Sequence, residues 1–124
     1  MDNARWKVVD PLGNEIRLGE KNFRYHIIGS HDSKDAKVRA EIEPQAKFAV
    51  TRPRFIISDI QSPGRVKYLS LTKIKDDTKV YIRTISVVVD TNGEVVTWFA
   101  RRTINDILEE GDVIYDAEYN DLPL

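Results

Sequence analysis

The two histidines of the chain are the side chains best suited to proton transfer near neutral pH. They are His26 and His31, which lie in the segment Tyr25 to His31 on either side of the short apolar run Ile27-Ile28. A spacing of five residues does not place both on one helix face, and the chain has no cysteine for a thiolate metal site. We therefore expect acid–base chemistry rather than metal ligation here, although a lone histidine is more often a surface or structural residue.

A second group of polar side chains lies around the turn Asn92-Gly93. Alternation along the strand that follows places Thr97 and Arg101 on one face and Trp98 on the other, more apolar face. Neighbouring strands and turns offer further cations and hydrogen-bonding groups: Arg83 or Tyr81, Tyr68 or Lys67, and Arg65. The simpler interpretation is cross-strand pairing on a solvated face, which contributes a few tenths to about 1 kcal/mol per pair.

Hydrophobic spacing predicts the helical elements that would hold these side chains. Apolar residues at a helical period begin after Asp32 or Ser33, either of which can cap the helix. The predicted face toward a sheet consists of Val38, Ile42, Ala46 and Ala49. Pro44 lacks an amide proton, so it predicts a kink, or two short helices of which it opens the second.

After Thr51-Arg52-Pro53 the pattern becomes that of strands. Strands are predicted over residues 55–60, 66–73, 78–90 and 94–101, and a last short one over 112–115. Asn92-Gly93 indicates a tight hairpin turn with positive φ at Gly93. One or two helical turns are expected within 103–110, and an N-terminal hairpin within 1–20. The fold class is thus α+β, a helical segment packed on a four- to five-stranded antiparallel meander.

Length and composition predict one globular domain over residues 1–124. No run approaches the ~20 apolar residues of a membrane span, and residues 1–10 do not resemble a secretory signal. With no cysteine, a cytoplasmic location is expected. Residues 1–105 carry all 19 Lys and Arg against 13 acids, a net of +6, whereas the acidic tail 106–124 has 7 acids and no base. That division suits a polyanion-binding body, although charged runs usually serve solubility.

The order of several short segments carries a family resemblance. They are His26 to His31, a helix, Pro53-Arg54-Phe55-Ile56, Gly64-Arg65-Val66-Lys67-Tyr68, Ser86 to Asp90, and Gly93 to Phe99. This order resembles the phage-associated branch of the barnase, EndoU, colicin and RelE nuclease superfamily. The resemblance covers residues 23–115, which form the expected nuclease-like core.

The resemblance implies a prophage- or toxin-like endoribonuclease that cleaves RNA by transesterification without a metal or other cofactor. A base takes the 2′-hydroxyl proton, the oxygen attacks the adjacent phosphate, and an acid protonates the leaving 5′-oxygen. It assigns His26 and His31 to the proton transfers, Arg101 to the phosphate, and Thr97 and Tyr68 to hydrogen bonds. Arg83, Lys67 and Arg65 are the further phosphate-binding residues. RNA and an inhibitor protein are the partners it implies.

Two other functions stay open on the residues alone. One is a non-enzymatic protein-binding module, phage-derived or regulatory, that uses the same sheet face. The other is a nucleic-acid binder without catalysis, whose binding would depend on salt. Convergence of His26, Thr97 and Arg101 on one concave site favours the enzyme, and their dispersal favours the binding module.

Overall fold

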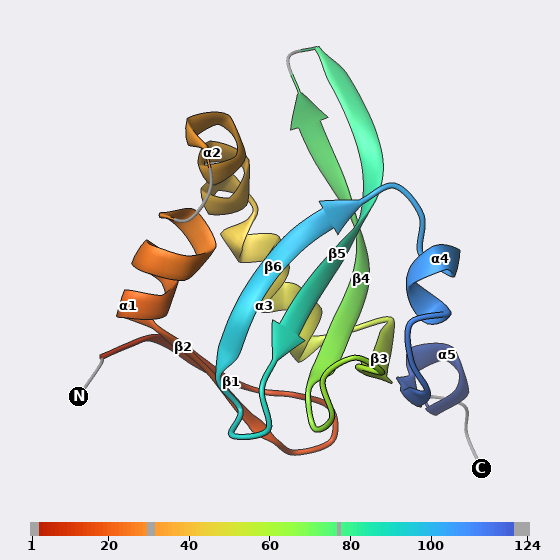
Figure 1. The fold of residues 1–124 in the computed structure, drawn as a ribbon. Helices are drawn as coiled ribbons and strands as arrows, with labels where there is room; N and C mark the ends of the chain where they lie inside the picture. Colours follow the sequence, from red (N-terminus) through yellow and green to blue (C-terminus); the bar gives the residue numbers. More distant parts are fainter. Residues whose placement is uncertain (1–2, 30–31, 77, 121–124) are drawn as a thin grey trace.

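The C-terminal half of the chain forms one five-stranded antiparallel sheet. The computed structural model describes residues 3–29, 32–76 and 78–120 (Figure 1). The strands are β3 (Phe55–Ser58), β4 (Val66–Asp76), β5 (Lys79–Val89), β6 (Val95–Arg101) and β7 (Val113–Asp116). Their order is β6-β5-β4-β3-β7, so β7 returns along the outer side of β3. The α+β class and the antiparallel meander are confirmed.

An N-terminal hairpin precedes the sheet and packs at one of its ends. Its strands are β1 (Ala4–Val9) and β2 (Glu15–Gly19), which pair with each other. The backbone N of Arg17 on β2 donates to the carbonyl of Gly93 at 2.8 Å. The Arg17 guanidinium also pairs with Glu94 at 2.9 Å. The hairpin is therefore joined to the β5–β6 turn by both backbone and side-chain contacts.

The helices are short and lie at several places around the sheet. They are α1 (Glu20–Asn22), the π-helix η1 (Phe23–Ile28), α2 (Ser33–Glu41), α3 (Glu43–Thr51), α4 (Asn105–Leu108) and α5 (Ala117–Asn120). The Asp32 side chain accepts from Asp35 N at 2.9 Å and caps α2, while Pro44 lies in the first turn of α3. The helical state of residues 20–28 was not predicted. Within the described ranges, no helix has the length and apolar character needed to cross a membrane.

The main core lies between α3 and the inner strands. Ala46, Ala49 and Val50 of α3 are buried against β4 and β5, in the same cluster as Trp98 of β6. Val38 was expected to face the sheet, but it is 39 % exposed. The break between α2 and α3 explains this difference, because α2 turns away from the direction of α3 and lies beside β6.

The opposite face of the sheet is partly covered by α4. A small apolar cluster there contains Ile57 of β3, Leu69 of β4 and Ile107 of α4. Beyond this cover, β4 and β5 extend past the ends of their neighbours as a two-stranded arm (Figure 1). The sheet thus has one face packed against helices and a second face that is only partly covered.

The turns at Gly13 and Gly93 share one construction. Gly13 N donates to Asp10 O and Gly93 N to Asp90 O, at 3.1 and 3.0 Å. Both glycines have positive φ, +87° and +83°, which confirms the value predicted for Gly93. The register of the β5–β6 pair shifts next to the second turn, as in three-residue hairpin loops that end in a left-handed residue.

Substitution of Gly13 and Gly93 separates the cost of a strained backbone from the cost of a steric clash, because both have positive φ but only Gly93 is crowded. A Cβ at Gly93 would lie 2.6 Å from the carbonyl oxygen of Glu15, whereas one at Gly13 would meet nothing within 4 Å. Gly13→Ala should therefore cost about 1 kcal/mol of unfolding free energy, the strain of a left-handed alanine. Gly93→Ala should cost at least about 1 kcal/mol more, because the N-terminal hairpin must also shift. Urea denaturation of both variants tests this, and equal losses would contradict the packing described for Gly93.

Candidate functional site

Two of the predicted cations meet at one carboxylate on the partly covered face of the sheet. Lys67 Nζ on β4 donates to Glu110 Oε2, and Arg101 Nη1 at the end of β6 donates to Glu110 Oε1, each at 2.5 Å. Lys67 and Arg101 share this face because Lys67 pairs with Val88 and Arg101 with Thr84, both of which point to the same side of β5. Glu110 comes from the segment between α4 and β7.

This Lys67–Glu110–Arg101 cluster lines a hollow of about 380 Å³. Asp59 and Glu109 also line it, so two cations face three acids. The side chain of Lys67 is 11 % exposed and that of Arg101 is 41 % exposed. Lys67 is thus held beneath the hollow, whereas the guanidinium of Arg101 is open to a molecule that enters it.

The environment of Glu110 keeps its carboxyl ionised. Its partial burial raises the pKa, but the hydrogen bonds and charges of Lys67 and Arg101 outweigh that effect, and the resulting pKa lies below the usual 4.5. An ionised carboxylate between two cations holds both donors in a fixed geometry, and it becomes a stronger proton acceptor when those cations leave it. The cluster therefore contains a proton acceptor and two groups able to bind an anion.

Thr97 is engaged by α2 rather than by Arg101. The Arg39 guanidinium reaches β6 and donates to Thr97 Oγ1 at 3.1 Å and to the carbonyl of Trp98. Asp35, one helical turn away, accepts from Arg39 at 3.2 Å. Sequence reasoning missed Arg39, because its only local signal is the i, i+4 spacing from Asp35, which does not indicate contact with β6.

His26 lies on η1, whose Phe23 and Ile27 belong to the main core. The helix is fastened beside β6, since Asn22 donates to the carbonyl of Val96 at 3.1 Å. The imidazole of His26 is exposed. η1 approaches from the helix-covered side of the sheet, whereas Lys67 and Arg101 occupy the other face. His31 lies outside the described residues.

Alternation separates Tyr68 from its neighbour Lys67. Tyr68 faces the main core, where its hydroxyl donates to Asp10 Oδ2 at 2.5 Å. Desolvation, followed by the hydrogen bond to Asp10 and its charge, raises the pKa of the Tyr68 phenol. Of the two β4 residues considered for the face of Arg101, the structure places Lys67 there and buries Tyr68.

The remaining predicted cations lie away from the hollow. Arg83 is on the β4–β5 arm, with its guanidinium 4.7 Å from the centre of the Tyr81 ring. Both point to the opposite side of β5 from Thr84, the partner of Arg101. Arg65 follows the turn at Gly64 and lies 3.8 Å from Asp90. Of the three residues predicted to bind phosphate besides Arg101, only Lys67 joins it.

Asp10 forms a buried polar centre that sequence reasoning treated only as part of a turn. It is 4 % exposed and accepts from Leu12 N at 3.0 Å and from Asn14 N at 2.8 Å, besides the Tyr68 hydroxyl. An aspartate at the first position of a turn commonly binds the backbone two residues on. Nothing in the local pattern indicated its contact with Tyr68, which is 58 residues away.

Comparison with known proteins leaves the resemblance as a prediction. No protein-family model matches the chain, and no curated protein shows significant similarity to it. In the described residues, no three His, Asp or Glu side chains gather in a way that could hold a metal ion. The contacts and charges around Glu110 are therefore the features of the molecule that bear on function.

The buried contact between Tyr68 and Asp10 predicts a specific alkaline response. Tyr68→Phe should lower the free energy of unfolding by about 1–3 kcal/mol at neutral pH, because Asp10 loses its phenolic donor. The folded pKa of Tyr68 exceeds the unfolded value of 10.0, so its contribution is complete below pH 10 and declines above it. Tyr68→Phe should consequently show a shallower loss of stability above pH 10 than the unaltered protein. Tyr119→Phe, at an exposed position, is the control. Parallel alkaline profiles for the protein and Tyr68→Phe would contradict the assignment.

Glu110 predicts the opposite response, in acid. Its folded pKa is lowered, so its contribution is complete above pH 4.5 and is lost as the pH falls through the folded value. The unaltered protein should therefore lose stability more steeply than Glu110→Gln on acidification below pH 4.5. Thermal melts across that range measure this difference. Glu109→Gln, at the exposed neighbouring position, should follow the unaltered protein; if Glu110→Gln also does so, the pairing contributes nothing.

Proposed function

We propose that this chain is a metal-independent endoribonuclease that cleaves RNA by 2′-hydroxyl transesterification in the hollow lined by Lys67, Glu110 and Arg101. The observation that carries the proposal is the convergence of a guanidinium and an ammonium on one ionised carboxylate beside an open hollow. Phosphodiester cleavage needs a proton acceptor next to groups that bind the phosphate. These three side chains supply both.

Each side chain has a distinct role in this proposal. The Arg101 guanidinium binds two phosphate oxygens, and Lys67 adds a second positive charge from below. Entry of the phosphate draws both cations from Glu110, whose carboxylate then accepts the 2′-hydroxyl proton. The new bond forms between the 2′-oxygen and phosphorus, and the bond from phosphorus to the 5′-oxygen breaks. The leaving 5′-oxygen takes its proton from solvent, because His26 lies on the other side of the sheet from this hollow.

A second candidate function is supported by other contacts of the same residues. Glu110 already neutralises Lys67 and Arg101, and Arg39 already occupies the Thr97 hydroxyl. His26 lies on the other side of the sheet from Arg101, and this dispersal favours a binding module. On the same sheet face, Leu71 and Ile82 are exposed. Paired cations and exposed apolar side chains suit a protein-binding surface as well as a catalytic one. The alternative is therefore a non-enzymatic binding module that uses this face.

Cleavage of RNA in the presence of EDTA distinguishes the two functions. We expect the unaltered protein to give products with 2′,3′-cyclic phosphate ends, and to leave a substrate with a single 2′-deoxyribose at the scissile position intact. Glu110→Gln should lower the rate roughly 100-fold or more, the usual effect of losing a positioned acid or base. His26→Ala should leave the rate nearly unchanged, because His26 lies across the sheet from the hollow. Arg101→Lys should retain binding but lose rate, because an ammonium cannot bind two oxygens at once.

The control is Lys37→Ala, which removes an exposed cation on α2 and should leave the rate unchanged. Circular dichroism establishes that every variant is folded. Intact RNA with the unaltered protein excludes the nuclease and leaves the binding module. Cleavage that Glu110→Gln does not slow would place the reaction outside this hollow.

A further inference from the structure

The edge of β4 that faces β3 has no partner strand along its outer half. β3 pairs with β4 only up to the pair Phe55 and Leu69, whereas β4 continues to Asp76. The carbonyl of Leu69 accepts from Arg54 N at 2.7 Å, so Leu69 directs its backbone groups to the β3 side. Backbone direction alternates along a strand, so Leu71 and the two residues at positions 73 and 75 direct theirs to the same side. Among the described strands, none pairs with β4 there.

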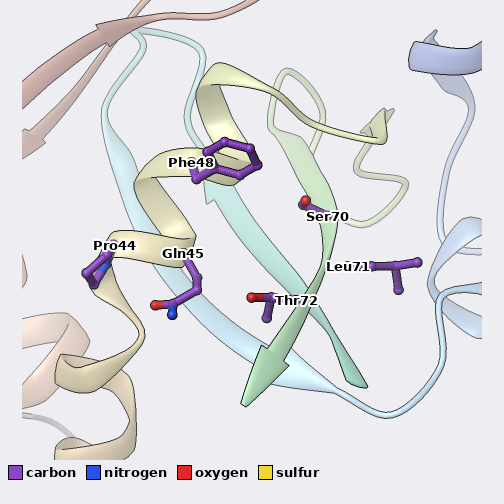
Figure 2. Close-up of a pocket in the computed structure, with 6 residues that line it drawn as sticks. All are labelled: Pro44, Gln45, Phe48, Ser70, Leu71 and Thr72. Atoms are coloured by element: carbon purple, nitrogen blue, oxygen red, sulfur yellow. The ribbon is translucent and has the colours of Figure 1, made fainter. Parts of the chain in front are cut away.

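A hollow lies next to this free edge, between α3 and β4 (Figure 2). Its volume is about 210 Å³, and its lining consists of Pro44, Gln45, Phe48, Ser70, Leu71 and Thr72. The Phe48 ring is 56 % exposed, a large apolar surface for one side chain. The side-chain oxygen of Gln45 is buried without a hydrogen-bond partner in the described residues. The hollow therefore offers an apolar wall and one unsatisfied acceptor beside a row of free backbone groups.

The charge and polarity of the arm indicate what could pair with this edge. Residues 70–84 contain four cations and only two acids, and both acids stand together at the tip, at positions 76 and 77. Lys73 and Lys75 lie on β4 at the free edge, on the same face as the exposed Leu71, and they alternate with the half-buried Thr72 and Ile74. Across the pair, Val80 and Ile82 of β5 are exposed on the same face as Lys73 and Lys75.

We propose that the β4 edge from Leu71 to Lys75 binds an extended, acidic segment of a partner protein as a sixth strand of the sheet. Backbone hydrogen bonds to a sheet edge provide affinity, and pockets for alternate side chains provide specificity. One apolar side chain of the segment enters the hollow beside Phe48. The side chains that alternate with it lie against Leu71 and Ile82, and Asp or Glu residues pair with Lys73 and Lys75.

Charge excludes a second copy of the chain as the favoured occupant. Antiparallel pairing of two identical edges would bring Lys73 and Lys75 of both copies together, and like charges on facing strands are destabilising. An acidic strand has the complementary charge. This edge lies apart from the hollow around Glu110, so the proposal holds whether or not the chain cleaves RNA.

Selection from a displayed library of random linear peptides on the full chain tests the proposal. We expect enriched peptides to combine Asp or Glu with apolar residues at alternating positions, and their affinity to fall with salt. A synthetic copy of the most enriched peptide then serves as the probe in fluorescence anisotropy. On binding, the backbone amides of Leu71, Lys73 and Lys75 should gain protection from hydrogen exchange.

Three variants address the separate parts of the site. Lys73→Pro removes a backbone donor that points away from β5, Phe48→Ala removes the wall of the hollow, and Lys73→Glu reverses the charge at the edge. Each should weaken the peptide by about tenfold or more, since each removes one source of edge recognition. Lys79→Glu, a charge reversal on β5 of the same arm, should change the affinity by less than about threefold because it is not at this edge.

Several results would overturn the proposal. Enriched peptides without the acidic, alternating pattern would remove the stated partner, and protection confined to amides outside residues 71–75 would move the site. If Phe48→Ala and Lys79→Glu bound the peptide with equal affinity, the site would also lie elsewhere. This comparison holds even if Lys73→Pro fails to fold. Light scattering that shows a dimer of the unaltered protein and a monomer of Lys73→Glu would assign the edge to a second copy.

Discussion

The burial of Trp98 is the constraint on which the arrangement of the helices depends. Its side chain is fully buried, and its indole N–H donates to the carbonyl of Arg39 at 2.9 Å. The Arg39 guanidinium returns to the Trp98 carbonyl and to Thr97, while the Phe23 ring lies 5.8 Å from the indole. Burying so large a side chain is favourable only if its polar N–H finds an acceptor. One residue of β6 thus contacts both α2 and η1.

The contrast between a basic body and an acidic tail is resolved within the molecule. Glu110 binds Lys67 and Arg101, and Asp116 and Glu118 both pair with Arg54. These contacts join segments far apart in the chain. The acidic tail therefore neutralises some of the cations on the basic body. A pair with an exposed partner, such as Arg54 with Glu118, contributes little stability, and its main effect is on what the surface can bind. An RNA phosphate at Arg101 must therefore compete with Glu110.

The alternation of side chains along each strand decides which of the candidate residues lie on the same face of the sheet. Lys67 and Tyr68 are adjacent in sequence, yet one lies in an open hollow and the other ends at a buried aspartate. The same alternation sends Arg83 away from Arg101, although both were considered for one phosphate site. Strand alternation thus removes Tyr68 and Arg83 from the face that carries Arg101. The site that remains is smaller than the predicted one and includes Glu110, which the sequence reasoning placed only in an acidic tail.

Local patterns were sufficient for much of the fold. The β-branched runs predicted the strands β3 to β6, Asn92-Gly93 predicted the positive φ of its glycine, and Pro44 predicted the start of α3. Turn, proline and strand preferences act within a few residues, so a single sequence shows them. The helical state of residues 20–28 was not evident, since it depends on Phe23 and Ile27 reaching the core around Trp98. The contacts of Glu110 with Lys67, of Arg39 with Thr97, and of Asp10 with Tyr68 join residues 43 to 58 positions apart. Such pairings leave no periodic trace in a single sequence, so only the tertiary structure decided which polar groups meet, which is the information a functional site consists of.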